Sequence, residues 1–200
     1  MESNSIQKNV FDVSKNVTPK DIVKTEKGNP YRLGASLTES GCNFAVFSRH
    51  ATDVYLLLYD DYKDALPSKV IKFDEKTNRT GDIWHIFVYG IKHGQHYGYA
   101  VDGPYWPLKS GHRFNVNKLI IDPYSKAVSG NYHWNKYDSF GYELTSRHGD
   151  ISFNENNNYD SEVKSIVVDD SKFNWEGDKQ LNIPLKDSII YELHTRAFTK

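Results

Sequence analysis

The sequence predicts a mainly β fold, an antiparallel β-sandwich, from three observations. Short apolar runs recur between residues 43 and 102. Residues that favour turns, mainly Gly, Asp and Pro, separate these runs. No helical periodicity of useful length is present between residues 31 and 108. Short strands at such spacing are typical of sandwiches in which neighbouring strands run antiparallel.

Five apolar runs are the strand candidates, and they occupy residues 43–48, 54–59, 70–73, 83–88 and 97–102. The last run has the clearest alternation. Tyr97, Tyr99 and Val101 are separated by smaller or polar residues, so their side chains share one face of the strand. This face is expected to point into the sandwich.

The chain divides into four parts. Residues 1–27 are polar and lack periodicity, which predicts a disordered tail. The sandwich is expected at residues 28–128, and an irregular linker packed between domains at residues 129–187. Residues 188–200 begin with an apolar run typical of a buried strand in a parallel sheet. Such strands need crossover connections, so we expect this run to start a second domain that is cut off.

Composition excludes several classes of function. The 200 residues carry a formal net charge of −1, and no basic face suggests a nucleic-acid partner. No apolar stretch has the length of a membrane span or signal peptide, so we expect a cytoplasmic protein without a membrane partner. The single cysteine, Cys42, fits a reducing compartment and is expected to be a small buried side chain.

Four groups of motifs occur in a fixed order along the chain. They are YRLGA (31–35) with NFAVFSRHA (43–51); GDIWH (81–85) with YGYAVDGP (97–104); GHRFN (111–115) with KLIIDPY (118–124); and SIVVDD (165–170) with FNWEGD (173–178) and IYELHTRAFTK (190–200). In this order the motifs resemble the N-terminal region of isoamylase-type glycogen debranching enzymes of glycoside hydrolase family 13. The resemblance covers residues 28–200.

This resemblance implies an immunoglobulin-like sandwich of the family 48 carbohydrate-binding-module type, followed by a (β/α)₈ barrel. Residues 189–196 match the first barrel strand, and a whole barrel needs about 250 residues. The family's catalytic carboxylates lie on later strands, so the resemblance implies that this chain holds no catalytic residue. The implied partners are an α-glucan, such as glycogen or limit dextrin, and the missing catalytic barrel. Intact enzymes of this type hydrolyse α-1,6 branch linkages.

The acidic residues offer no convincing second active site. Retaining glycosidases need two carboxyl groups about 5–5.5 Å apart. Asp60-Asp61 and Asp169-Asp170 are sequence neighbours, which point to opposite faces of an extended chain. Glu192 belongs to the barrel-strand motif, where a structural hydrogen bond or ion pair is the simpler role.

Metal or cofactor binding is not expected either. His93 and His96 are separated by two residues, but Gly94 favours a turn over the helix that would bring both rings together. His112 and Arg113 lie in the third motif group, and the resemblance suggests that they anchor the irregular segment. Turn histidines are usually solvated.

Sugar binding is the more plausible chemistry, because pyranose rings present flat C–H faces to aromatic side chains. Trp106, Tyr105 and Trp84 are the candidate carbohydrate-binding residues. Trp106 follows the fifth strand between two prolines, and it roughly matches a sugar-contacting Trp of glucan-binding relatives. Trp84 shares a strand face with apolar residues, so a place in the core is the alternative; Tyr97 and Tyr99 are also expected in the core.

Two other functions remain open from the sequence. The chain could be a stand-alone glucan-binding module, or a docking domain for the barrel that binds no glucan. Glucan-binding relatives have an Asn-Asp-Trp element after an early strand, and this sequence has Tyr59–Lys63 there without the Trp. This difference favours the docking alternative.

Overall fold

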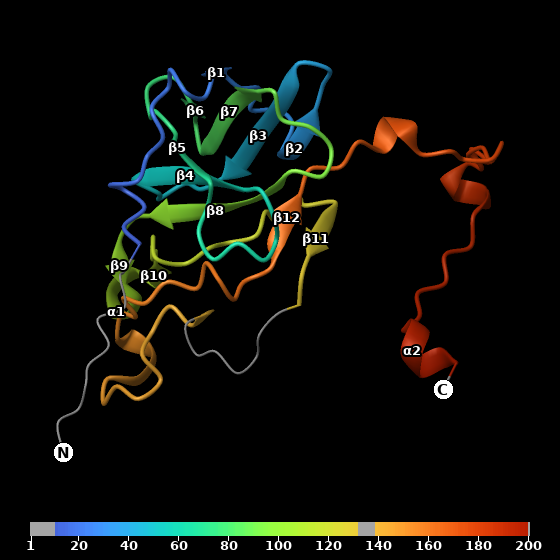
Figure 1. Ribbon diagram of the computed structural model, residues 1–200. Helices are drawn as coiled ribbons and strands as arrows, with labels where there is room; N and C mark the ends of the chain where they lie inside the picture. Colours follow the sequence, from blue (N-terminus) through green and yellow to red (C-terminus); the bar gives the residue numbers. More distant parts are fainter. Residues whose placement is uncertain (1–10, 132–138, 200) are drawn as a thin grey trace. The chain divides into compact units, whose positions relative to one another are not determined.

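The computed structural model describes residues 11–131 and 139–199 (Figure 1). The chain divides into two compact units, Met1–Asp169 and Asp170–Lys200. The first unit contains two five-stranded antiparallel sheets, which we call sheet A and sheet B. The prediction of a β-sandwich is confirmed.

Each sheet combines strands that are distant in sequence. In sheet A the order is β1-β7-β3-β2, and β6 also pairs with β7; the strands are β1 (Thr25–Lys27), β2 (Gly34–Leu37), β3 (Gly41–Phe47), β6 (Arg79–Thr80) and β7 (Ile83–Tyr89). In sheet B the order is β11-β12-β8-β4-β5; the strands are β4 (Asp53–Tyr59), β5 (Lys69–Lys72), β8 (His96–Asp102), β11 (Ala127–Ser129) and β12 (Lys164–Ile166).

The main core lies between the two sheets and follows the period-two alternation of their strands. Phe44 on β3 packs edge-to-face against Tyr97 on β8, with ring centroids 5.0 Å apart. Tyr99 and Val101 point to the same core, as the sequence predicts. These aromatic contacts join sheet A to sheet B.

A second apolar cluster covers the opposite face of sheet B. Tyr55 and Leu57 on β4 are buried there under Val13, Leu119 and Tyr159. The cover therefore comes from segments far apart in the sequence. As a result, neither face of this sheet is left open at its centre.

The expected tail over residues 1–27 is wrong for the part that the structure describes. Val13 and Val23 are buried, and β1 pairs with β7 along residues 25–27. Thr18 binds the edge strand β5 twice, because its backbone N–H donates to Val70 O and its hydroxyl accepts from Val70 N–H. A few well-spaced apolar residues are enough to hold this polar segment on the sandwich.

The irregular linker also differs from its prediction. Strand β11 ends at Ser129, the first residue of this linker, and strand β12 lies inside it. Both strands extend sheet B. Residues 132–138 of this linker lie outside the described residues. The sandwich therefore reaches beyond residue 128, and the packing of the linker between domains stays a prediction.

Among its described residues, the second unit contains only short helices. They are η3 (Asp170–Lys172), η4 (Leu185–Asp187) and α2 (Thr195–Phe198). The strand predicted to begin at residue 188 is not formed, and Ile189 is 99% exposed. A strand needs a ladder of hydrogen bonds to a neighbour, and no described residue pairs with this segment. Its assignment to a barrel stays a prediction.

Among the described residues, no helix is long and apolar enough to cross a membrane.

Candidate functional site

A small hairpin carries the best-placed sugar-binding candidate. After the Asp102-Gly103-Pro104 turn, β9 (Tyr105–Trp106) pairs with β10 (His112–Arg113). Between them lies the single-turn helix α1 (Pro107–Ser110), which begins with Pro107 and is followed by Gly111 in the left-handed conformation, φ 75°. Proline at the first position and glycine after the last position are the residues that favour the start and the end of a helix. The hairpin therefore holds its side chains on a short, well-determined scaffold.

Trp106 is the exposed aromatic residue of this hairpin. Its residue is 55% exposed, and Lys109 Nζ lies 5.4 Å from the ring centroid. His112 is its cross-strand partner, and the His112 ring packs at 4.5 Å on the ring of His50. The structure thus brings an open indole face close to groups that can donate or accept hydrogen bonds.

Tyr105 has a different environment from its neighbour, as expected for adjacent residues of a strand. Its hydroxyl donates to the backbone carbonyl of Ser152, and its ring packs edge-to-face on Phe153 at 4.9 Å. Both contacts attach the hairpin to the irregular segment. Tyr105 is half-buried and serves as an anchor, so it offers less free ring surface than Trp106.

The prediction that Trp84 binds carbohydrate is wrong, because Trp84 is 0% exposed. Its Nε1 donates to Ser48 O over 3.0 Å, and Phe73 packs edge-to-face against it. A ring enclosed in this way cannot meet a sugar. The alternative that placed Trp84 in the core describes the structure.

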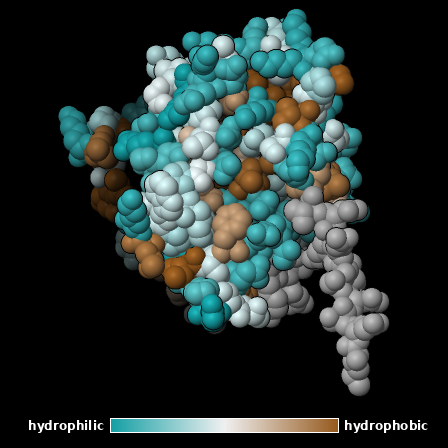
Figure 2. All heavy atoms as spheres, turned by 90° about the vertical axis from the view of Figure 1, so that its left-hand side faces the viewer, coloured by the Kyte–Doolittle hydropathy of each residue, from teal (hydrophilic) through white to brown (hydrophobic). Residues whose placement is uncertain are grey.

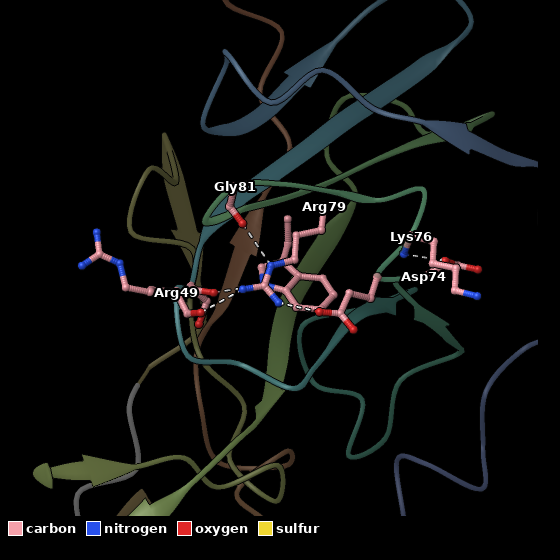
Figure 3. A network of polar contacts seen from close by, with 8 residues as sticks. Arg49, Asp74, Lys76, Arg79 and Gly81 are labelled. Carbon is pink, nitrogen blue, oxygen red and sulfur yellow. Dashed lines mark hydrogen bonds and ion pairs between the residues drawn. The ribbon is translucent and has the colours of Figure 1, made fainter.

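Arg79 closes the edge of the core over Trp84 (Figure 3). Its guanidinium lies 4.9 Å from the Trp84 ring and donates to Glu75 Oε1, Arg49 O and Gly81 O. Figure 3 shows these contacts converging on Arg79 from separate loops. With three acceptors and an aromatic face, this arginine is used to fix loops and is not available to a ligand.

The other polar candidates also have structural roles. Asp60 accepts from the Ser68 hydroxyl, and Asp61 accepts from the backbone of Lys63, so this pair shapes a loop. Arg113 pairs with Asp150 at 2.9 Å and anchors the irregular segment. Glu192 lies exposed in the second unit.

No metal site is present among residues 11–131 and 139–199, in which no group of three or more His, Cys, Asp or Glu could hold an ion. His93 Nδ1 accepts from the backbone N–H of Asp169, which explains its place in the turn. Cys42 is fully buried, and burial raises the pKa of its thiol to about 12. A thiol that stays protonated is a poor nucleophile.

A network of buried asparagines, which could not be predicted from the sequence, holds residues 115–119 against residues 141–158. Asn154 and Asn158 lie in a polar stretch without a predicted strand or helix, and both are buried. Asn158 Oδ1 accepts from Leu119 N–H, and Asn115 Nδ2 donates to the carbonyls of Gly141 and Asn154. Asparagine is usually exposed, and no local pattern in the sequence marks these asparagines as buried.

An apolar pocket lies beside this network, with a volume of about 720 Å³. Its walls come from β3, from β8 and from irregular stretches between residues 105 and 162. They include Phe47, Val101, Phe114, Ile120 and Ile121. Tyr105 also lines this pocket, whereas Trp106 does not. The Trp106 surface and the pocket are therefore separate features on two sides of one strand.

The two packed sheets define a β-sandwich module. A family model described as carbohydrate-binding module 48, the isoamylase N-terminal domain, matches residues 32–125. This part of the chain, a little under half of its 200 residues, is therefore similar to this family. The match begins just before β2 and ends just after the turn at residues 123–124.

Whole-chain comparison gives similarity to debranching enzymes. The chain is 36% identical over 173 residues to a glycogen debranching enzyme of Yersinia enterocolitica, covering 86% of this chain and 24% of the relative. It is 39% identical over 185 residues to the chloroplastic isoamylase 3 of Oryza sativa, covering 88% and 21%. The chain thus resembles the N-terminal region of such enzymes and spans less than a quarter of each relative.

Solved structures show a looser likeness. A pullulanase from Bacillus acidopullulyticus aligns at a TM-score of 0.42 and 19% identity, covering 69% of this chain and 12% of the pullulanase.

Proposed function

We propose that this chain is the non-catalytic N-terminal module of an α-glucan debranching enzyme, and that its Trp106 hairpin contacts the glucan. The exposed position of Trp106 on the β9–β10 hairpin is the observation that carries the proposal. The family match and the names of the relatives supply the class of ligand. Glycogen and limit dextrin are the expected substrates of the intact enzyme.

The chemistry of this surface suits a neutral polysaccharide. An indole face packs well against the C–H face of a glucose unit, and flanking polar groups can bind its hydroxyls. Lys109 and His112 are the polar neighbours of Trp106. Figure 2 views the side on which Figure 1 draws β9, β10 and α1, and it shows apolar patches separated by hydrophilic atoms. The two polar side chains beside Trp106 favour a sugar over an apolar partner at the hairpin.

Hydrolysis would be the task of another part of the protein. Hydrolysis with retention needs two facing carboxyl groups, one as nucleophile and one as acid. Asp60, Asp61 and Glu192 occupy loop or exposed positions that provide no such pair. We therefore expect the 200-residue protein to release no reducing sugar from glycogen, and release above the blank would refute this expectation.

Binding of glycogen tests the proposal directly. We expect the purified chain to be retarded in native gels that contain glycogen, with retardation lost in Trp106→Ala. Trp175→Ala is the matched control, because Trp175 is 65% exposed but lies in the second unit. Equal retardation of the two variants would show that Trp106 is not the contact.

A docking module without glucan affinity is the second candidate. The apolar pocket favours it, because most of the surface exposed inside the pocket is apolar. Absence of any retention on glycogen, with the fold intact, would favour this second function. A cytoplasmic location belongs to the same proposal, although two of the relatives carry the description chloroplastic.

A further inference from the structure

A polar pocket lies at the turn that leads into β8, and we call it the Gly94 pocket. Its volume is about 300 Å³, and most of the surface exposed inside it is polar. The lining comes from the end of β4 and from the turn between β7 and β8, and it includes Asp60, Lys92, His93 and Gln95. Ligand pockets usually have a few hundred Å³ or more, so this space suits one small unit of a ligand.

The backbone holds this turn in shape without a ligand. Gly90 and Gly94 have positive φ angles of 76° and 89°, which glycine adopts more readily than other residues. Gly94 N–H donates to Val167 O at 2.9 Å. Gln95 Nε2 donates to Tyr59 O at 2.7 Å and so joins the turn to the end of β4. A preformed pocket loses little conformational entropy when a ligand binds.

Four side chains of the pocket keep hydrogen-bonding groups that the fold does not use. His93 Nδ1 accepts from Asp169 N–H at 3.0 Å, so the neutral ring carries its proton on Nε2, which can donate to a ligand. Asp60 Oδ1 accepts from a serine hydroxyl, and Asp60 Oδ2 has no hydrogen-bond partner among the described residues. Within the same part of the chain, the Lys92 ammonium group and Gln95 Oε1 also have none. The pocket therefore offers two donors and two acceptors.

This combination selects the chemistry of the ligand. Each hydroxyl of a sugar can donate one hydrogen bond and accept others, so a sugar can use donors and acceptors together. An apolar ligand would leave the four groups without hydrogen bonds, which costs free energy. An anion would be attracted by Lys92 but repelled by Asp60. A neutral sugar therefore fits the Gly94 pocket better than an apolar or an anionic ligand.

We propose that the Gly94 pocket binds one hexose unit of the glucan, as a second sugar site separate from Trp106. The class of ligand rests on the proposed function, whereas the pocket itself uses no residue of the hairpin. The pocket precedes the first residue of β8 and the hairpin follows the last one; in Figure 1 the β8 arrow points toward β9. A strand of seven residues is about 20 Å long. Two weak sites on one module bind a polysaccharide more tightly than either site alone, so the loss of one should weaken retention strongly.

Titration with maltose tests the pocket separately from the hairpin, because two glucose units are too short to reach both sites at once. Amide NMR spectra of the 200-residue chain should show saturable shifts of the Gly90 and Gly94 signals, and Trp106→Ala should leave these shifts unchanged. The double variant Asp60→Asn with Lys92→Met should need at least about tenfold more maltose for the same shifts, because it removes a charged acceptor and a charged donor.

Asp21→Asn with Lys20→Met is the matched control, because it changes the same charges at two exposed residues outside the pocket. This control should bind maltose as the wild type does. Absence of saturable shifts at Gly90 and Gly94, or equal maltose affinity in the pocket variant, would overturn the proposal. Saturation of these signals by less inorganic phosphate than maltose would also overturn it, since the site would then select anions. If only the Trp106 contact is wrong, the glycine shifts remain while Trp106→Ala keeps full retardation by glycogen.

Discussion

The outer face of sheet B and the β9–β10 hairpin both carry aromatic side chains outside the main core, but only one is open. On sheet B, Tyr55 and Tyr59 are buried beneath Val13, Leu119 and Tyr159. On the hairpin, Trp106 is covered by no later segment among the described residues. The difference teaches that an aromatic residue becomes a binding platform only where the rest of the chain leaves it uncovered.

Replacing a residue of this cover should have the largest effect on stability. Tyr159 is buried, its hydroxyl donates to Val116 O over 2.9 Å, and its ring packs edge-to-face on Phe11. Tyr159→Ala is expected to lower the free energy of unfolding by about 3–5 kcal/mol, the usual cost of replacing a buried aromatic residue by alanine. Urea denaturation followed by tryptophan fluorescence measures the change. A loss below about 1 kcal/mol would mean that the outer cluster is loosely packed.

A smaller change sharpens the same point from the opposite side. A Cβ on Gly98 would lie 2.5 Å from Leu119 Cδ1, so Gly98→Ala overfills the space between sheet B and its cover. We expect a loss of about 1–3 kcal/mol. Gly141→Ala is the control, because a Cβ there meets nothing within 4 Å. If both variants lose the same stability, the cover does not touch the sheet as closely as the structure shows.

The strands could be predicted from the sequence, but their cover could not. Alternation at residues 97–102 assigned Tyr97 and Tyr99 to the core, because period two is a local property of the chain. The buried positions of Val13 and Asn158 depend on contacts with residues far away in the sequence. At the candidate site the sequence separated Trp84 from Trp106 only in part. The apolar strand face of Trp84 left the core open as an alternative, and tertiary packing decides that Trp84 is buried while Trp106 is 55% exposed.

Asp122 anchors the segment that covers sheet B, and its carboxyl makes the stability of the fold depend on pH. Its carboxylate accepts from the Tyr97 hydroxyl at 2.9 Å and from Tyr124 N–H. Burial raises the pKa of this carboxyl above its ordinary value of 3.8. The folded state therefore keeps a proton that the unfolded state has lost, and stability falls as pH rises through this window.

Asp122→Asn should remove this contribution. The difference in unfolding temperature, wild type minus variant, is expected to decrease between about pH 4 and pH 7. Circular dichroism melts across this range measure it. A difference that grows with pH would show that hydrogen bonds to the charged carboxylate outweigh its burial.

The smallest effect is expected at the open site itself. Trp106→Ala removes a half-exposed ring whose nearest cation, Lys109, lies 5.4 Å from its centroid, and an exposed cation–π pair contributes only about 0.5–1 kcal/mol. We therefore expect the free energy of unfolding to change by no more than about 1 kcal/mol, against several for Tyr159→Ala. A large loss would mean that Trp106 supports the hairpin and is not kept free for a ligand. Small loss of stability combined with full loss of glycogen retention is the pattern that distinguishes a binding residue from a packing residue.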